Sequence, residues 1–282
     1  MYQAGLVMEG GGMKGIYTAG VLDFFMEKDI LFSSCYGVSA GACHMASYLS
    51  GQKGRAYRIS VNYLKDKDYC SVRSLIKTGD MFGAEMCYHK IPDELDLYDY
   101  KAYHNYKGKA YAVVTNIETG KAEYLQIKDM KKDIDAIRAS ASLPLLSRAV
   151  EIGGKYYLDG GCSDSIPIKK SLRDGNKKNV VIMTKEVGYR RKPSSYVKPM
   201  QVRYRKYPEL VKDMARRHIV YNKTLDFLQE QEKKGHIFIL RPQRDPGIGR
   251  LEKDGKKLRA LYQMGYDDAK ERYDDLMAYL EK

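Results

Sequence analysis

The sequence has 282 residues, 44% hydrophobic and 30% charged, which is long enough for one large α/β domain with a sizeable core. Its 25 glycines, 8 prolines and 25 tyrosines are typical of a globular chain and exclude collagen-like, disordered and polytopic membrane classes. Lysine and arginine exceed aspartate and glutamate by 49 to 36, and the net charge of +13 favours anionic partners such as phosphate head groups or nucleic acid.

The first fifty residues alternate between short apolar runs and helical patterns. Residues 4–8 predict a buried strand, the glycines of 10–15 a turn, and residues 16–28 a helix with one apolar side. A second strand is expected around 35–38, followed by a helix of small residues over 40–49. Repeated strand, turn and helix units indicate a mainly parallel sheet flanked by helices.

The middle of the chain is less regular. Residues 54–106 are rich in Tyr, Asp and Lys with weak periodicity, and we expect a cap or side layer there. Two hairpins are predicted, over 110–127 and 151–158, separated by a helix over 133–142 that stops before Pro144.

The C-terminal third begins with a buried strand over 179–184. The basic stretch 185–217 then holds eleven basic and three acidic side chains. Beyond it, helices are expected over 208–233 and 252–282, with a strand at 236–240 between them. No repeat or linker separates these parts, so we expect a core of residues 4–185 with an extension, 186–282, packed on the same domain.

Targeting signals and cysteine pairs are not evident. The N-terminus lacks a basic region followed by an apolar one, and no run approaches the roughly 18 apolar residues of a membrane span, so we expect a cytoplasmic protein. The five cysteines are scattered and never spaced as Cys-x-x-Cys, which favours reduced thiols over disulfides or a zinc site.

The pentapeptide Gly37-Val38-Ser39-Ala40-Gly41 matches Gly-x-Ser-x-Gly, the nucleophile elbow. In that motif a strained turn between a strand and a helix exposes the serine hydroxyl, and small neighbours avoid clashes around it. A strand is expected before Ser39 and a helix of small residues after it, and the N-terminus of that helix favours developing negative charge. Ser39 is therefore the candidate nucleophile.

Gly10-Gly11-Gly12-Met13-Lys14-Gly15 also follows a strand and opens a helix. It matches the dinucleotide fingerprint Gly-x-Gly-x-x-Gly, but the second strand offers no acid for a ribose. A Walker-type phosphate loop requires Ser or Thr after the lysine, and Gly15 stands there. An oxyanion hole for attack by Ser39 remains, with a tight packing turn as the structural alternative.

A serine nucleophile needs a base, and the five histidines lie in no motif that would supply one. Asp159-Gly160-Gly161, in contrast, places a carboxylate at a strand end before two glycines that permit close approach of another backbone. Asp159 is therefore the candidate base.

Taken together, these motifs resemble the patatin-like phospholipase family, which uses a Ser-Asp dyad in place of a triad. The segment Ala139-Ser140-Ala141-Ser142-Leu143-Pro144 is similar to the family's Ala-Ser-rich segment before the catalytic aspartate. The resemblance spans about residues 4–185 and implies a three-layer α/β sandwich with a mainly parallel sheet. It also implies Ser39 as nucleophile, Asp159 as general base and Gly10, Gly11 and Gly12 as the oxyanion hole. The supporting motif positions would be Lys14, Gly15, Gly37, Gly41, Gly160 and Gly161.

The resemblance implies an intracellular lipid acyl hydrolase of the phospholipase A or lysophospholipase type, without metal or other cofactor. Many relatives carry arginine where Lys14 stands, which leaves the role of this residue open. A carboxylesterase or acyl-thioesterase would use the same dyad, and a silent lipid-binding or regulatory protein could keep the fold without turnover.

The partner expected is a lipid ester, and no nucleic-acid motif accompanies the charge. The stretch 185–217 could contact an anionic membrane surface or be a solvated face. Head group, acyl length and oligomeric state are left open.

Overall fold

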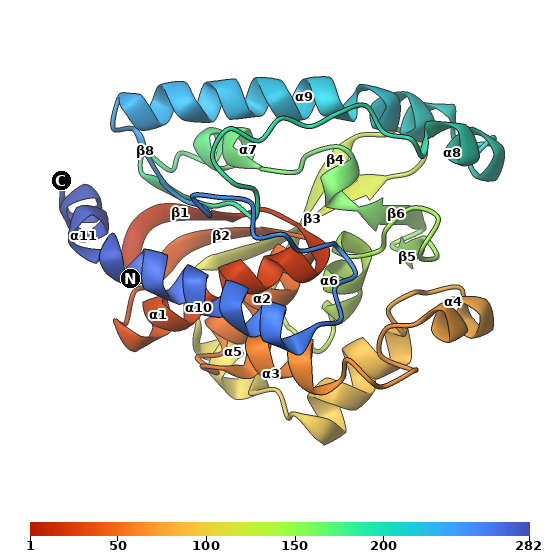
Figure 1. The fold of residues 1–282 in the computed structure, drawn as a ribbon, viewed down its shortest axis with the longest axis horizontal. Coiled ribbons are helices and arrows are strands. Elements are labelled where there is room, and N and C mark those ends of the chain that lie inside the picture. Colours follow the sequence, from red (N-terminus) through yellow and green to blue (C-terminus); the bar gives the residue numbers. More distant parts are fainter.

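The buried apolar runs of the sequence form the strands of one eight-stranded mixed sheet. The computed structural model describes residues 1–282 and is drawn in Figure 1. In chain order the strands are β1 (Tyr2–Met8), β2 (Phe32–Val38), β3 (Lys109–Asn116), β4 (Ala122–Ile127), β5 (Val150–Ile152), β6 (Lys155–Asp159), β7 (Asn179–Ile182) and β8 (Ile237–Leu240).

The centre of the sheet is parallel. Its order is β5-β6-β3-β2-β1-β7-β8, with β4 paired to β3. Strand β1 pairs in parallel with β2 and β7, and the β2–β3 and β7–β8 pairs are parallel too. The pairs of β3 with β4 and β6, and of β5 with β6, are antiparallel. The mainly parallel sheet expected from the sequence is confirmed, with hairpins added at one end.

Helices cover both faces, because successive side chains of each strand point to opposite sides. On β1, Leu6 and Met8 pack into the largest apolar cluster, whereas Val7 packs into a second cluster with Tyr221 and Leu228. The first cluster lies under α1 (Ile16–Glu27), α2 (Ala40–Leu49), α10 (Gly255–Glu271) and α11 (Tyr273–Glu281). The second lies under α7 (Ile168–Arg173) and the long α9 (Pro208–Lys233), above the sheet in Figure 1. These three layers confirm the α/β sandwich.

The C-terminal helix α10 packs closely against α1. A Cβ on Gly20 would lie 2.0 Å from the carbonyl oxygen of Tyr262, and one on Gly265 would lie 2.1 Å from that of Tyr17. Only glycine permits this approach of the two backbones. The helices expected over 252–282 are α10 and α11, which meet at Arg272.

Residues 54–106 form a side layer of short helices, at the bottom of Figure 1. They comprise α3 (Arg55–Asn62), α4 (Val72–Thr78), the π-helical segment η2 (Met86–Leu95) and α5 (Tyr100–Asn105). The remaining elements are the 3₁₀ turns η1 (Gly12–Gly15) and η3 (Gly160–Cys162), α6 (Ile134–Ser140) and α8 (Val197–Arg203). All five cysteines are free. None of the helices combines the length and apolar character that a bilayer crossing demands.

Candidate active site

Ser39 occupies a strained turn between β2 and α2. Its backbone has φ 54° and ψ −124°, a region that costs a non-glycine residue about 1–3 kcal/mol. The flanking glycines make the turn possible: a Cβ on Gly37 would lie 2.5 Å from Cα of Ala42, and one on Gly41 2.6 Å from the carbonyl oxygen of Met8. The Gly-x-Ser-x-Gly pattern therefore has the geometry of a nucleophile elbow.

Ser140 holds this turn from the adjacent helix α6. The backbone N–H of Ser39 donates to Oγ of Ser140 at 2.9 Å, and that hydroxyl donates to the carbonyl oxygen of Val113 at 2.6 Å. Ser140 is fully buried. Sequence reasoning noticed the Ala-Ser-rich segment only as part of a resemblance and assigned Ser140 no role.

Strand β3 brings Asp159 to the elbow. Val113 of β3 pairs with Val38 at the end of β2, and the next residue, Val114, pairs with Asp159 at the end of β6. Strand β4 pairs along one edge of β3. Strand β6 therefore pairs along the opposite edge, which β2 also uses, and lies beyond the end of β2. The two strand ends therefore face each other, one residue apart in the register of β3.

Two backbone contacts fix the carboxylate there. The N–H of Asp159 donates to the carbonyl oxygen of Ser142 at 2.8 Å. A Cβ on Gly160 would lie 2.1 Å from the carbonyl oxygen of Val113, so only glycine fits after Asp159. The N–H of Gly161 donates to Oδ1 of Asp159 at 2.7 Å. A Cβ on Gly161 would lie 3.0 Å from that same Oδ1 and 3.1 Å from Nη2 of Arg217, so a side chain there would crowd the carboxylate.

The Asp159 carboxylate is buried, and the protein donates hydrogen bonds to only part of it. The side chain is 2% exposed, and Oδ2 has no hydrogen-bond partner of ordinary geometry. Burial raises the pKa of Asp159, while the nearby Ser39 hydroxyl, the Gly161 amide and the charges of Arg217 and Arg250 oppose that rise. A carboxylate with a raised pKa is a stronger base than an exposed one.

The glycine loop 10–12 lies directly against the elbow. A Cβ on Gly10 would lie 2.8 Å from Cβ of Ser39, and Gly12 adopts φ +57° beneath the carbonyl oxygen of Arg250. The amides of Gly10 and Gly11 donate no hydrogen bond within the chain. Free amides beside a serine hydroxyl are the arrangement of an oxyanion hole.

The two other motif residues of this loop join it to neighbouring segments. Lys14 is nearly buried and forms an ion pair with Asp245 at 3.3 Å, and the N–H of Met13 donates to the carbonyl oxygen of Arg250 at 3.0 Å. A Cβ on Gly15 would lie 2.7 Å from Cβ of Ala40. Lys14 therefore holds the loop that precedes α10 in place over the glycine turn.

Ser39, Asp159 and Gly10–Gly12 line one small cavity of about 30 Å³. No histidine lines it. His44, one turn after Ser39 on α2, faces elsewhere, and burial lowers its pKa to about 4, so it is neutral at pH 7. No group of three or more His, Cys, Asp or Glu side chains is placed to hold a metal. Four cationic side chains, which sequence reasoning did not connect with the site, complete the wall: Lys185, Arg191, Arg217 and Arg250.

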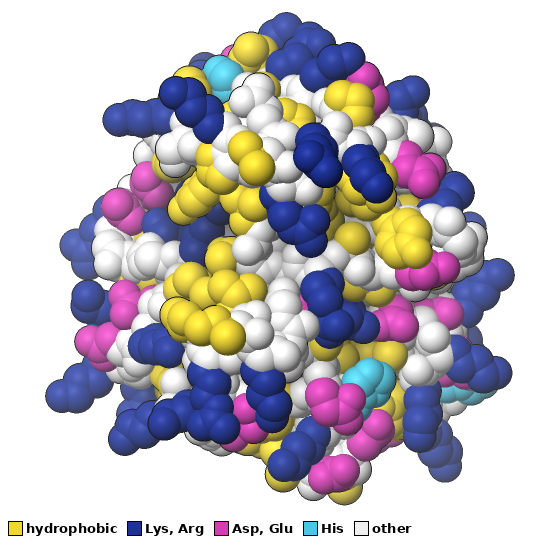
Figure 2. Space-filling view, turned by 90° about the vertical axis from the view of Figure 1, so that its right-hand side faces the viewer, with side chains coloured by type: hydrophobic (Ala, Val, Ile, Leu, Met, Phe, Trp, Pro, Cys, Tyr) yellow, Lys and Arg dark blue, Asp and Glu magenta, His cyan; other side chains and the backbone are white.

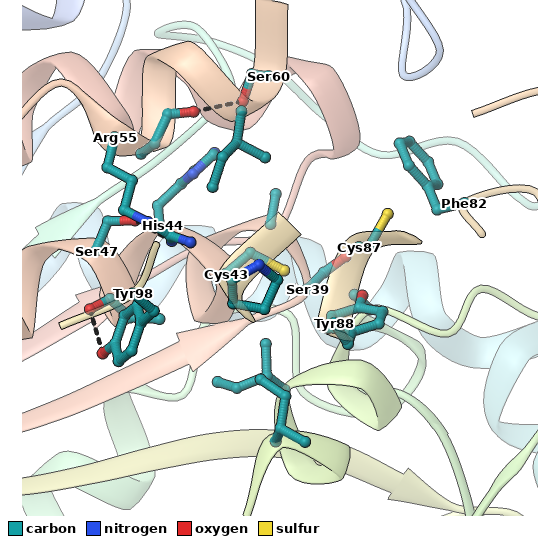
Figure 3. A pocket seen from close by; sticks show the side chains of 18 of the residues that line it. Ser39, Cys43, His44, Ser47, Arg55, Ser60, Phe82, Cys87, Tyr88 and Tyr98 are labelled. Carbon is teal, nitrogen blue, oxygen red and sulfur yellow. Dashed lines mark hydrogen bonds between the residues drawn. The ribbon is translucent and has the colours of Figure 1, made fainter. Parts of the chain in front are cut away.

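A larger apolar cavity of about 160 Å³ is also lined by Ser39. Figure 3 shows Ser39 and Cys43 near its centre, between Arg55 and Tyr98 on one side and Phe82 on the other. Eighteen of its 25 lining residues are hydrophobic. Most of them come from α2, α6 and the side layer 54–106, so the region that sequence patterns described least supplies much of the cavity wall.

Comparisons with known proteins identify the family of the chain. The family model described as patatin-like phospholipase matches residues 6–171, and a domain of unknown function, DUF6363, matches residues 207–281. The uncharacterized protein YjjU of Escherichia coli K12 is 32% identical, over 64% of this chain and 51% of YjjU. The probable lipid hydrolase 463L of invertebrate iridescent virus 6 is 25% identical, over 63% of this chain and 66% of the viral protein.

The chain thus spans about half to two thirds of these relatives. Among solved structures, VipD from Legionella pneumophila superposes with a TM-score of 0.46 and 13% identity, over all of this chain and 67% of VipD. The family match covers more than half of the sequence and contains the elbow, the glycine loop and the Asp-Gly-Gly turn. The chain belongs to the patatin-like phospholipase family.

Proposed function

We propose that this protein is a serine acyl hydrolase that cleaves fatty acyl esters of phospholipids or lysophospholipids. The observation that carries the proposal is the shared position of Ser39. It lies in one cavity with Asp159 and the glycine loop, and it also opens onto the apolar cavity. An acyl chain in the apolar cavity would place its ester carbonyl at the hydroxyl. The relative named as a probable lipid hydrolase supports the same chemistry.

Acylation would begin with attack of Oγ of Ser39 on the ester carbonyl. Oδ2 of Asp159, which has no other partner, takes the hydroxyl proton as the new C–O bond forms. The free amides of Gly10 and Gly11 stabilise the oxyanion, a contribution of about 2.7–4 kcal/mol per donor in characterised hydrolases. The intermediate then expels the alcohol, which receives the proton from Asp159.

Deacylation would repeat these steps with water. Asp159 takes a proton from a water molecule, whose oxygen attacks the acyl-serine carbonyl, and the collapse of the intermediate releases the fatty acid and returns the proton to Oγ of Ser39. The raised pKa of Asp159, caused by its burial, makes both proton transfers from weak acids easier.

We also propose a division of labour along the chain. Residues 4–185 carry the nucleophile, the base and the oxyanion amides. The extension, residues 186–282, supplies β8, α9 and α10 to the same sandwich and places Arg191, Arg217 and Arg250 in the site wall.

The basic stretch 185–217 is proposed as a peripheral contact with anionic membranes. Exposed apolar side chains stand among its cations: Val202 is 78% exposed, Tyr196 58% and Val187 47%. Figure 2, which faces the end of the molecule with α8, shows Lys and Arg side chains with hydrophobic patches between them. Each cation near an anionic surface contributes about 1 kcal/mol. Cosedimentation with anionic vesicles should fall with salt and be weaker with zwitterionic vesicles. Binding that ignores both would contradict the contact.

A substrate panel tests the proposed activity. Phospholipid, lysophospholipid, triacylglycerol and acyl-thioester substrates are compared for the wild type and Ser39→Ala, with Ser163→Ala, a nearby serine outside the cavity, as the matched control. We expect release of fatty acid from phospholipid or lysophospholipid, lost only in Ser39→Ala. Turnover confined to the thioester would favour an acyl-thioesterase. No turnover of any substrate would contradict the proposal and favour a silent lipid-binding protein.

A further inference from the structure

Four cations surround the reacting groups, and none of them forms an ion pair. Lys185, Arg191, Arg217 and Arg250 all line the small cavity, where Asp159 is the only acid. None of the four forms an ion pair, although sixteen ion pairs occur elsewhere in the chain. Arg190, next to Arg191, is by contrast paired with Asp226. The lining of the cavity therefore carries four cations and one acid, a net positive charge.

Arg191 is held rigidly with unused donors. Its guanidinium stacks on the Tyr221 ring, 4.0 Å from the centroid. Its backbone N–H donates to Oδ1 of Asn222 at 2.9 Å, and Nδ2 of Asn222 donates to its carbonyl oxygen at 3.0 Å. Nε of Arg191 is buried and has no partner. The side chain is therefore positioned before any ligand arrives.

Arg217 has a single, distant acceptor. It projects from α9, its Nη2 donates one long hydrogen bond to Ser165 Oγ at 3.4 Å, and its buried Nε donates none. Burial and the neighbouring Arg191 lower the pKa of Arg217 to about 10. Burial and the nearby Lys14 lower the pKa of Lys185 to about 8. Buried cationic groups whose N–H donors find few acceptors are costly, which indicates a site built for an anion.

None of the four cations lines the apolar cavity. The apolar cavity shares Gly12, Ser39 and Leu143 with the small cavity, whereas a basic groove of about 730 Å³ shares Asp159, Arg191, Arg217 and Arg250 with it. An ester with its acyl chain in the apolar cavity would extend its alcohol portion into this groove.

We propose that Arg191, Arg217 and Arg250, with Lys185, bind a phosphate group carried by the alcohol portion of the ester. Guanidinium groups match phosphate oxygens in pairs of parallel hydrogen bonds, which suits a phosphate monoester or diester. This assignment rests on the acyl-hydrolase function proposed above. All four residues lie outside the family match at residues 6–171, and the three arginines belong to the extension, residues 186–282.

Binding is measured first, without catalysis, by calorimetry on Ser39→Ala. The probes are glycerol 3-phosphate, inorganic phosphate and glycerol. We expect glycerol 3-phosphate to bind and glycerol not to bind. Adding Arg191→Gln and Arg217→Gln together to Ser39→Ala should weaken the affinity for glycerol 3-phosphate at least about tenfold. Arg216→Gln is the matched control, because Arg216 is an exposed neighbour on α9 that lines none of these cavities. Equal loss with Arg216→Gln would overturn the site.

Kinetics then test the role of the phosphate. Two esters with the same acyl chain, a monoacylglycerol and its 3-phosphate, are compared below their aggregation concentrations. The ratio of their kcat/KM values cancels any change at Asp159. We expect a preference of at least about tenfold for the phosphate ester, reduced toward unity in Arg191→Gln and Arg217→Gln and kept in Arg216→Gln.

The outcomes separate the two proposals. Esterase activity with a wild-type ratio near unity would overturn the phosphate site and leave the hydrolase standing. Glycerol 3-phosphate binding that depends on Arg191 and Arg217, with no hydrolysis of any ester, would support the site and contradict the hydrolase. Inorganic phosphate binding alone, without a kinetic preference, would overturn the assignment to an ester-borne phosphate.

Discussion

The Ser140 hydroxyl offers a direct test of how the elbow is held. Ser140→Ala removes the hydroxyl that links the Ser39 N–H to the Val113 carbonyl oxygen, at 2.9 and 2.6 Å. Each hydrogen bond is worth about 1 kcal/mol net, and a buried group left without a partner costs about 1–3 kcal/mol. We expect a loss of about 2–4 kcal/mol in the free energy of unfolding.

The same change should slow catalysis. The Ser39 backbone at φ 54° stores about 1–3 kcal/mol of strain, and the turn can relax once its amide is released. Since about 1.36 kcal/mol corresponds to a tenfold change in rate, kcat should fall about 10- to 100-fold. Ser142→Ala is the matched control, because that hydroxyl donates only to the carbonyl oxygen of Arg138, four residues back.

Thermal melts and ester kinetics on both variants provide the assay. For a chain of this size, Ser140→Ala should lower Tm by about 5–10 °C, and Ser142→Ala by much less. Equal effects of the two substitutions on Tm and kcat would refute the claim that Ser140 holds the elbow.

Three further changes test other parts of the site. Burial raises the pKa of Asp159, so the ionised carboxylate opposes folding above that pKa. Asp159→Asn should therefore abolish turnover but raise Tm at pH 7. This gain in Tm should shrink in melts at lower pH. A lower Tm at every pH would contradict this. Gly10→Ala places a Cβ 2.8 Å from that of Ser39 and should reduce kcat at least about 100-fold in the same ester assay; near-normal kcat would exclude Gly10 from the oxyanion hole. Ala56→Phe fills the apolar cavity and should shift kcat/KM toward shorter acyl chains in a chain-length series; an unchanged preference would place the acyl chain elsewhere.

Local patterns predicted most of the sheet and its helices. The helix expected over 40–49 coincides with α2, and the strands at 4–8 and 179–184 correspond to β1 and β7. Strand, turn and helix signals depend on neighbouring residues, so they can be interpreted without knowing the fold. The patatin-like family, predicted from the order of three glycine-containing motifs, is confirmed by the family match.

Long-range pairing could not be predicted from these patterns. Nothing near Val113 and Val114 indicates that β2 and β6 meet along one edge of β3, yet this register sets the approach of Ser39 to Asp159. Ser140 lay within a noticed segment, but its role depends on the position of Val113.

The same limit applies to the cations of the site. Arg217 belongs to a basic stretch that patterns assign to the surface, because the register of α9 over the sheet is not visible in sequence. Arg250 comes from a loop with no motif. Two contacts hold this loop over the glycine turn: the ion pair of Lys14 with Asp245 and the backbone hydrogen bond from Met13 to Arg250.

Covalent labelling by a fluorophosphonate probe, followed by peptide mass mapping, tests most directly whether Ser39 is the nucleophile and Asp159 its base. Ser39 and Ser165 are the two hydroxyl-bearing residues of the small cavity, so Ser165→Ala is the control. We expect a single adduct on Ser39, formed at the wild-type rate in Ser165→Ala, slowed strongly in Asp159→Asn and absent in Ser39→Ala. An adduct on Ser165, or labelling of Ser39 at an undiminished rate in Asp159→Asn, would contradict it.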